Sequence, residues 1–252
     1  MLDSTLFFAL AVPAVVLMGM SKGGFSGLGL ISMPMLALAI SPVTAAAIML
    51  PILIVQDAVS VWAYRRDFDR KILLIMLPGA LVGIAVGWFL AAQVPEAAVR
   101  VGVGLISVGF VLMYWGRRNV MAEGERTRGS TGAGVFWGAV SGYTSFVAHA
   151  GGPPFQVHVL PQRLSPQLYA GTSTMFFAAV NLVKVFPYVA LGQFSSENLK
   201  ASALFFPIAI ASTFLGVWMV RRLDARRFFT LIYALSFVVG VKLIWDGIRD
   251  LI

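Results

Sequence analysis

Two lysines lie inside long apolar stretches of the chain, where a positive charge could hold an anion. Lys22 lies in the glycine-rich segment 21–29, and Lys184 lies in an apolar stretch over residues 167–191. An ammonium group at membrane depth is costly and usually has a function, so each lysine is a candidate binding residue for an anion. Two other interpretations stay open. Lys22 can reach the water at the mouth of a hairpin, and Lys184 can form a charge pair.

Asp57 and its neighbours supply acidic and amide groups that could accompany these lysines. Asp57 lies about 12 Å inside the end of a predicted helix. It can pair with Lys22 or Lys184, or it can carry a coupling proton, and a structural pair is the favoured interpretation. Gln56 precedes it and belongs to the same candidate group for coupling or charge pairing. Asn181 lies three residues before Lys184, so these two side chains share one helix face.

Two histidines, His149 and His158, flank a second glycine-rich break at residues 150–154. Histidine titrates near neutral pH, so the pair is a candidate for coupling ion movement to protons, with His158 grouped with Asp57 in that role. The alternative is that each histidine is a satisfied polar residue in a helix bundle. A pair nine residues apart in a chain without cysteine is no metal-binding pattern, so we predict no metal site.

The two breaks could present backbone N–H groups to an anion. Half-helices that start near Leu28 and Pro154 would aim their positive ends at the centre of the protein, and glycine lets a ligand approach the backbone closely. The alternative is that the glycines only allow tight helix packing. The predicted substrate-binding residues are Lys22, Ser21, Gly23, Gly24, Gly27, Ser145, His149, Gly151, Gly152, Gln156, Thr172, Ser173, Asn181 and Lys184.

The composition of the chain places these residues in a membrane. Of the 252 residues, 59% are hydrophobic and only 12% are charged, whereas a soluble domain has about 25% charged residues. About 20 apolar residues cross a bilayer as a helix. Spanning helices are predicted over 43–64, 72–92, 98–115, 167–191, 200–220 and 227–247. Aromatic residues near their ends are predicted to be interfacial anchors, namely Trp62, Tyr64, Trp115, Tyr188, Trp218 and Trp245.

The net charge of +8 reports membrane topology and does not indicate nucleic-acid binding. Twelve of the 19 basic residues lie in three loops, within 65–71, 117–128 and 221–227. Short loops rich in lysine and arginine mark the cytoplasmic side. No secretory signal peptide is predicted, because the first residues lack a basic segment. The absence of cysteine leaves the redox compartment undetermined.

Two apolar stretches, 6–40 and 131–165, do not fit single spans and are each broken by glycine. We predict two re-entrant hairpins, each made of two short half-helices, and the alternative is a kinked, tilted helix in each place. The fold class is therefore an all-α polytopic membrane protein with an inverted repeat, in which each half is a broken, re-entrant hairpin plus three transmembrane helices. The predicted divisions are a first repeat over 1–116, a basic cytoplasmic linker over 117–131 and a second, inverted repeat over 132–252.

An internal repeat supports this division. A shift of 124 residues places Tyr64 on Tyr188, and Asp57 on Asn181. Three spans follow each hairpin, and three is an odd number, so the second copy enters the membrane from the opposite side. Inverted repeats with broken helices are a transporter architecture.

The motif residues resemble those of the TauE/SafE family of sulfite exporter-like permeases. Residues 19–34 (GMSKGGFSGLGLISMP) resemble the first motif of that family. The second motif is matched by Gly151-Gly152-Pro153, then Gly171-Thr172-Ser173, and then Asn181 and Lys184. The resemblance covers nearly the whole chain. It implies export or uptake of a small sulfur-containing anion, such as sulfite, a sulfonate or a sulfonated organic acid, across a prokaryotic inner (plasma) membrane.

The expected function is a secondary permease that works by alternating access, with no cofactor beyond a coupling proton or cation gradient. An anion channel without coupling is the alternative. An enzyme is not expected, because no nucleophile and base can be assembled from these residues. The expected partners are the anion and the lipid bilayer, with a homodimer as an option and no nucleic acid.

Overall fold

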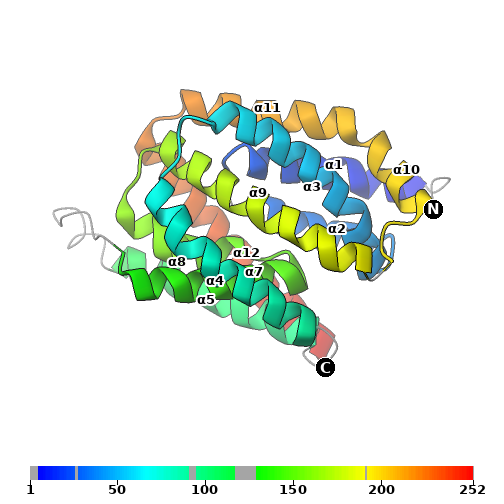
Figure 1. Cartoon of the computed structure of the whole chain (residues 1–252), viewed down its shortest axis with the longest axis horizontal. Helices are drawn as coiled ribbons and strands as arrows, with labels where there is room; N and C mark the ends of the chain where they lie inside the picture. Colours follow the sequence, from blue (N-terminus) through cyan, green and yellow to red (C-terminus); the bar gives the residue numbers. More distant parts are fainter. Residues whose placement is uncertain (1–4, 26–27, 91–94, 117–128, 191, 252) are drawn as a thin grey trace. The chain divides into compact units, whose positions relative to one another are not determined.

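The computed structural model describes residues 5–25, 28–90, 95–116, 129–190 and 192–251, and these residues contain helices and no strand (Figure 1). The elements are α1 (Thr5–Lys22), the 3₁₀-helix η1 (Leu28–Ile31), α2 (Ser32–Ala37), α3 (Pro42–Tyr64), α4 (Arg70–Leu90), α5 (Glu96–Gly116), α7 (Thr131–Ala148), α8 (Gly152–Val159), the 3₁₀-helix η2 (Leu160–Gln162), α9 (Pro166–Ala190), α10 (Ser196–Leu204), α11 (Phe206–Arg222) and α12 (Ala225–Leu251). The all-helical fold class is confirmed.

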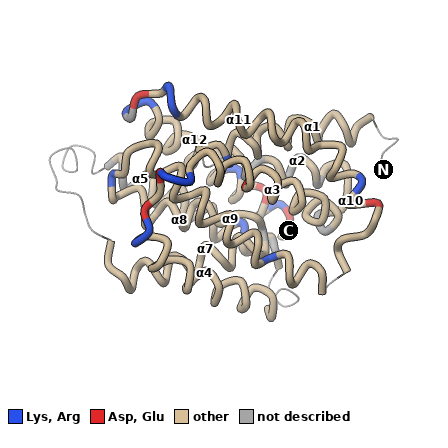
Figure 2. The backbone as a smooth tube through the Cα atoms, turned by 45° about the horizontal axis from the view of Figure 1, so that its top comes forward, with Lys and Arg blue, Asp and Glu red and all other residues tan. Residues whose placement is uncertain are grey.

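Five of the described helices are long and apolar enough to cross a membrane: α1, α3, α4, α9 and α12. The last four match predicted spans. The predicted span over 98–115 lies in α5. The apolar stretch described there, Ala97–Leu112, is shorter than the other candidate spans. Charged residues lie mostly in loops and at helix ends, and long stretches of helix have none (Figure 2). The chain is therefore a multi-pass membrane protein.

The prediction of one unbroken helix over 200–220 is wrong. The chain there forms α10 and α11, which meet at an angle of 47°. Pro207 is the cause, because it has no N–H for a helical hydrogen bond and disfavours helical geometry in the residue before it. Phe205, at the bend, donates its N–H to Ser202 O at 3.0 Å, which is the tighter 3₁₀ pattern. The bent pair counts as a sixth candidate span.

Each predicted hairpin has one long arm and one short arm, so the expectation of two short half-helices is wrong for the first arm of each. The long arms α1 and α7 have 18 residues each, or about 27 Å of helix. The short arms α2 and α8 have six and eight residues. Glycine and a left-handed residue separate the arms: Gly24 has a φ of +131°, and His149 has a φ of 50° at the end of α7. The chain therefore breaks at both predicted places.

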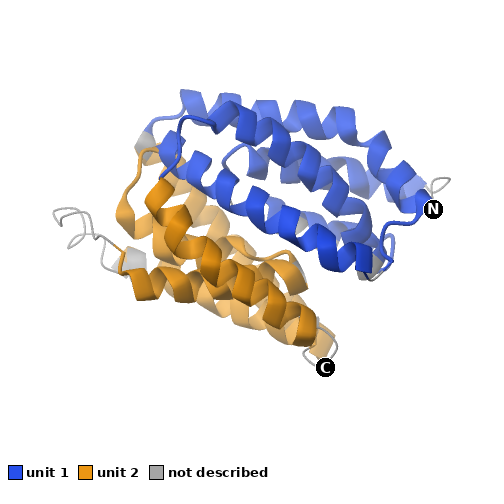
Figure 3. Cartoon of the chain, viewed as in Figure 1, with its two compact units in different colours: residues 1–69, 166–224 blue, residues 70–165, 225–252 orange. Residues whose placement is uncertain are grey.

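The helices pack into two compact units, each with segments from both halves of the chain (Figure 3). Unit 1 comprises residues 1–69 and 166–224, and unit 2 comprises residues 70–165 and 225–252. The predicted repeats over 1–116 and 132–252 are a different division, drawn along the sequence, and they stay a prediction. Most of the predicted linker over 117–131 lies outside the described residues.

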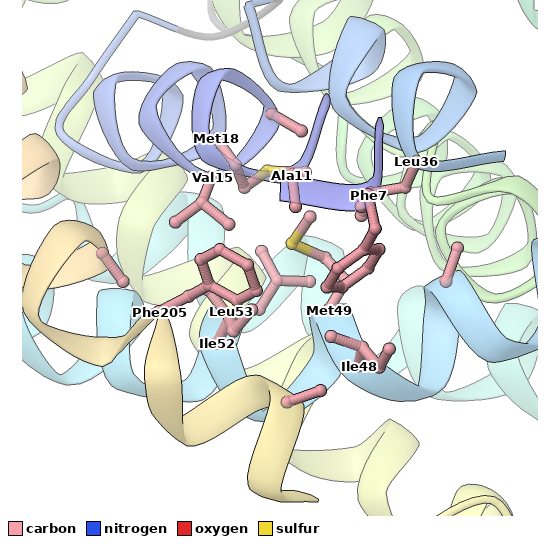
Figure 4. Close-up of a cluster of buried hydrophobic side chains, with 14 residues drawn as sticks. Phe7, Ala11, Val15, Met18, Leu36, Ile48, Met49, Ile52, Leu53 and Phe205 are labelled. Atoms are coloured by element: carbon pink, nitrogen blue, oxygen red, sulfur yellow. The ribbon is translucent and has the colours of Figure 1, made fainter. Parts of the chain in front are cut away.

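An apolar cluster holds one part of unit 1 together. In it, Phe7, Val15 and Met18 of α1 contact residues of α3 and Phe205 at the α10–α11 bend (Figure 4). Phe7 and Phe205 pack edge to face, with ring centroids 5.9 Å apart. The cluster ends along α1 at Met18, one turn before Lys22. The apolar core therefore fixes the helix whose end carries the first candidate residue.

Small residues bring the long helices of each unit into close contact. In unit 1, Gly23, directly after α1, lies against Gly216 of α11, where an added Cβ would be 2.6 Å from Gly216 Cα. In unit 2, glycines of α4 and α7 face each other's backbones, as Gly79 does with Val135. Membrane helices associate through small residues of this kind, because lipid supplies no hydrophobic drive between them.

Candidate functional site

A buried ion pair lies at the end of α1. Lys22 Nζ is 2.6 Å from Asp57 Oδ1 of α3, and the two side chains are only 11% and 6% exposed. Lys22 also lies in the last turn of its helix, where a cation is favoured by the helix dipole. Of the alternatives for Lys22 and Asp57, the structure shows the ion pair between them.

Asn181 of α9 completes the surroundings of this carboxylate. Its Nδ2 donates a hydrogen bond of 2.7 Å to Asp57 Oδ2. The contact of Oδ1 with Lys22 is an ion pair by distance but lacks hydrogen-bond geometry, so Oδ1 accepts no hydrogen bond among the described residues. Each carboxylate oxygen is thus engaged by a different helix, one by a cation and one by an amide.

Lys184 is fully buried one turn after Asn181 on α9. It is repelled by Lys22 and attracted by Asp57, so it belongs to the same electrostatic group. Two ammonium groups then share one carboxylate, and the fully charged group carries a formal charge of +1. We call Lys22, Asp57, Asn181 and Lys184 the charge cluster.

Hydroxyl groups hold the backbone next to Lys22. Ser60 Oγ and Thr174 Oγ1 donate to Lys22 O at 3.0 and 3.3 Å, and Tyr64 Oη donates to Gly23 O at 2.6 Å. The last carbonyls of a helix have no partner within it, so these hydroxyls satisfy groups that water would otherwise bind. The prediction of Tyr64 as an interfacial anchor is wrong, since this side chain is fully buried.

Glycine is required at the first break for two different reasons. Gly24 has a φ of +131°, a conformation that other residues rarely adopt, and an added Cβ would lie 2.7 Å from Val220 and 2.9 Å from Ala170. Gly23 packs against Gly216, as described above. At Gly23 the structure thus has the tight packing that was the alternative to anion binding. Gly27 lies outside the described residues. Ser21 is partly buried in the last turn of α1.

Gln56 is buried in α3, next to Asp57 in the sequence. Its Nε2 donates to Val15 O of α1 at 3.1 Å. Its Oε1 is buried and accepts no hydrogen bond among the described residues. Gln56 therefore ties α3 to α1 and leaves one buried acceptor beside Asp57.

The second break belongs to unit 2 and has its own polar contacts. Ser141 Oγ donates to Gly151 O at 2.7 Å, and Gln156 Oε1 accepts from Ser236 Oγ of α12 at 2.6 Å. Prolines follow Gly152 in the first turn of α8, where their missing N–H costs no helical hydrogen bond. An added Cβ at Gly152 would meet no described atom within 4 Å. Gly152 thus has open space around it, unlike Gly23.

The remaining predicted residues lie at several places. Ser145 is buried in α7, and His149 caps the end of that helix. His158 is buried in α8 beside Gly134, where an added Cβ would be 3.0 Å from its Nε2. His149 and His158 are therefore at different places in unit 2, and the described residues contain no group of His, Cys, Asp and Glu that could hold a metal ion.

Thr172 and Ser173 are buried near the start of α9. Thr172 Oγ1 donates to Leu168 O at 2.6 Å and accepts from Asp69 N at 2.9 Å. Its hydroxyl therefore anchors the loop after α3. The structure brings together four predicted residues, the charge cluster. Lys22 and the second break belong to different units. That they line one common anion site therefore stays a prediction.

The contributions of Ser60, Tyr64 and Thr174 were not predicted. A signal for two of them exists in the sequence, because Asp57, Ser60 and Tyr64 lie three and four residues apart and so form one polar stripe on an apolar helix. A polar stripe on a membrane helix indicates a buried partner, which here is the end of α1.

Comparison with known proteins adds one finding. A family model described as sulfite exporter TauE/SafE matches residues 11–243, which is nearly the whole chain. We find no match among curated proteins and none among solved structures.

Proposed function

The chain belongs to the TauE/SafE sulfite exporter family, and from this premise we propose that it is a secondary transporter that moves a small sulfur-containing anion across the plasma membrane by alternating access. The substrates that we propose are sulfite, a sulfonate or a sulfonated organic acid. Membership of a transporter family is consistent with the expectation that the chain is not an enzyme.

The observation that supports this proposal most is the charge cluster. Two ammonium groups and one carboxylate are buried between apolar helices, with a formal excess of one positive charge. An uncompensated charge in a membrane is costly unless a ligand balances it. An oxyanion beside Lys22 or Lys184 would supply that balance through charge-assisted hydrogen bonds. Asn181 has an amide that could donate to the same anion once it releases Asp57.

Packing within each unit supports the inverted repeat on which alternating access depends. The repeat pairs α1 with α7 and α11 with α4. In unit 1, α1 packs along α11, and in unit 2, α7 packs along α4. Each contact is therefore the counterpart of the other under the proposed repeat. Transporters of this architecture rock one group of helices against another around a central site.

The second break is part of the same proposal. The open space at Gly152 would let an oxyanion approach the backbone N–H groups of Gly151 and Gly152 at the start of α8, since Pro153 and Pro154 have none. Ser145, His149, Gly151 and Gln156 stay candidates for contacts with the anion in unit 2.

Flux measurements in proteoliposomes would test the proposal. Purified protein would be reconstituted and given radiolabelled sulfite, methanesulfonate or sulfoacetate, with protein-free liposomes as the blank. We expect saturable uptake of at least one anion and faster uptake when the unlabelled anion is inside. Lys22→Met is expected to abolish uptake, and Lys200→Met, at an exposed position of α10, to leave it unchanged. Absence of flux for every anion would contradict the function, and a large non-saturating conductance would show a channel instead.

A further inference from the structure

The charge cluster has a net formal charge of +1 when all its groups are charged, and either of two events can neutralise it. With all groups charged, Lys22 and Lys184 carry two positive charges, and Asp57 carries one negative charge. The charge of +1 disappears when an anion binds next to the cluster. It also disappears when one lysine releases its proton. These two events exclude each other, because an anion is held by the charged form of a lysine and not by the neutral form.

We propose that Lys184 is the proton carrier of this transporter, so that each anion binds and moves together with one proton. The inference depends on the proposed transport of an anion. In the empty site Lys184 is a neutral amine. A proton and an anion then enter together, the amine becomes an ammonium group, and the ammonium group holds the anion. Both leave on the other side, which restores the amine and balances the charge for a monovalent anion.

Lys184 fits this role better than Lys22. Lys22 is 2.6 Å from Asp57 Oδ1 and lies in the last turn of α1, so its ammonium group already has a close counter-charge and the helix dipole beside it. Lys184 is fully buried and is repelled by the ammonium group of Lys22. Of the two lysines, Lys184 is therefore the one that gains most from an incoming anion.

Asp57 fits the role less well than Lys184. Its two oxygens are already engaged, one in the ion pair with Lys22 and one in the hydrogen bond from Asn181. A proton on Asp57 would remove the negative charge that both lysines share. The carboxylate is instead the fixed charge against which Lys184 gains and loses its proton.

On the described helices that pack against α9, the charged groups outside the cluster do not take part in this proton exchange. Helix α9 packs against α3 and α11. From α3, Asp57 acts on Lys184, and from the end of α1, Lys22 acts on it. The charged residues of α11 are Arg221 and Arg222 in its last turn, and guanidinium groups stay protonated at all relevant pH values.

The decisive variant is Lys184→Arg, because arginine keeps the positive charge but cannot release its proton. Proteoliposomes with a trapped pH-sensitive dye would report proton movement driven by a gradient of methanesulfonate, a strong-acid anion that carries no proton of its own near neutral pH. We expect one proton per anion for the wild type. For Lys184→Arg, we expect anion-driven proton movement to be lost. Lys200→Arg, the same exchange at an exposed position, is the control and is expected to retain the wild-type ratio.

Anion binding at different pH values gives a second readout, which needs no flux. We expect the affinity of the wild type for methanesulfonate to fall about tenfold per pH unit where the empty Lys184 is neutral. The pH dependence of Lys184→Arg is the baseline to subtract. Proton uptake by the wild type on adding the anion, in weakly buffered detergent solution, measures the same event without any variant and covers the case in which Lys184→Arg does not fold.

The outcomes separate this inference from the proposed function. Anion flux without accompanying protons in the wild type would overturn the inference and leave the transporter. The inference would also be overturned if the Lys184→Arg variant still moved one proton per anion. Absence of any anion flux or binding in the wild type would overturn the proposed function itself.

Discussion

Asp57 and Asn181 are 124 residues apart in the chain, and their side chains form a hydrogen bond of 2.7 Å. The sequence repeat places these two residues at the same position of its two copies. Residues that a two-fold axis exchanges can touch only where they both lie next to that axis. A hydrogen bond between two such residues is compatible with an inverted repeat, and it supports the prediction that α3 and α9 are counterparts.

The ion pair between Lys22 and Asp57 is expected to matter for stability as well as for binding. Lys22→Met would remove the cation that lies 2.6 Å from Asp57 Oδ1 and leave the buried carboxylate to Lys184 alone, so we expect the free energy of unfolding to fall by up to about 3–5 kcal/mol. Arg249→Met removes an exposed pair in which the two atoms are 3.6 Å apart, and we expect a loss below about 1 kcal/mol. Denaturation in detergent would measure both. Equal losses would contradict a buried, energetically coupled pair.

The hydroxyl of Tyr64 is expected to hold the first break in place. Tyr64→Phe would leave the carbonyl of Gly23 without this partner, at a cost of about 1–3 kcal/mol. Tyr143→Phe is the control, since the described residues show no hydrogen bond from its hydroxyl, and we expect a change within about 0.5 kcal/mol. Thermal unfolding of the two variants side by side would check this, and a harmless Tyr64→Phe would mean that another group satisfies Gly23.

Gly24 is expected to tolerate no side chain. Gly24→Ala would force a strained backbone conformation and a clash with Val220 and Ala170, so we expect a loss of about 1–3 kcal/mol or more. Gly102 in α5 has no described atom within 4 Å of an added Cβ. Gly102→Ala is therefore expected to leave stability unchanged or to raise it by up to about 1 kcal/mol. Unfolding midpoints would separate the two, and equal midpoints would refute the requirement for glycine at position 24.

Gly152 offers a test of the second break that does not disturb the fold. Gly152→Ala meets no described atom within 4 Å, so the unfolding midpoint is expected to stay the same. If an anion approaches the start of α8, the new methyl group obstructs it, and we expect its affinity to fall about tenfold, or about 1.4 kcal/mol. Gly132→Ala, which is equally open, is expected to change neither quantity. Unchanged anion affinity in Gly152→Ala would remove the second break from the site.

The sequence was sufficient to predict most of the helices, because blocks of about 20 apolar residues have few alternatives in a membrane. It was not sufficient at Pro207, where a single residue bends the span over 200–220, nor for the lengths of the hairpin arms. Composition reports that a stretch is apolar. It does not report how many residues come before the turn, which local dihedral angles decide.

The charge cluster was predictable in part. An aspartate and two lysines in apolar helices require partners, so a pair of Asp57 with either lysine was among the predictions. Which lysine it pairs with depends on how α1, α3 and α9 pack, and pairwise spacing along one helix does not contain that information. Tyr64 was misplaced for the same reason. It lies next to a basic loop, which suggests an interfacial anchor, but the end of α1 covers it.

The most direct test of the central claim is equilibrium binding of radiolabelled sulfite and sulfonates to the purified double variant Lys22→Met/Asp57→Leu. This variant replaces a buried ion pair with apolar side chains and keeps the net charge of the cluster, so we expect it to fold with near wild-type stability. We predict that its affinity for every anion that the wild type binds falls at least about tenfold, because Lys184 alone is left to hold the anion. Binding of such an anion with wild-type affinity would show that the Lys22–Asp57 pair is not part of the anion site.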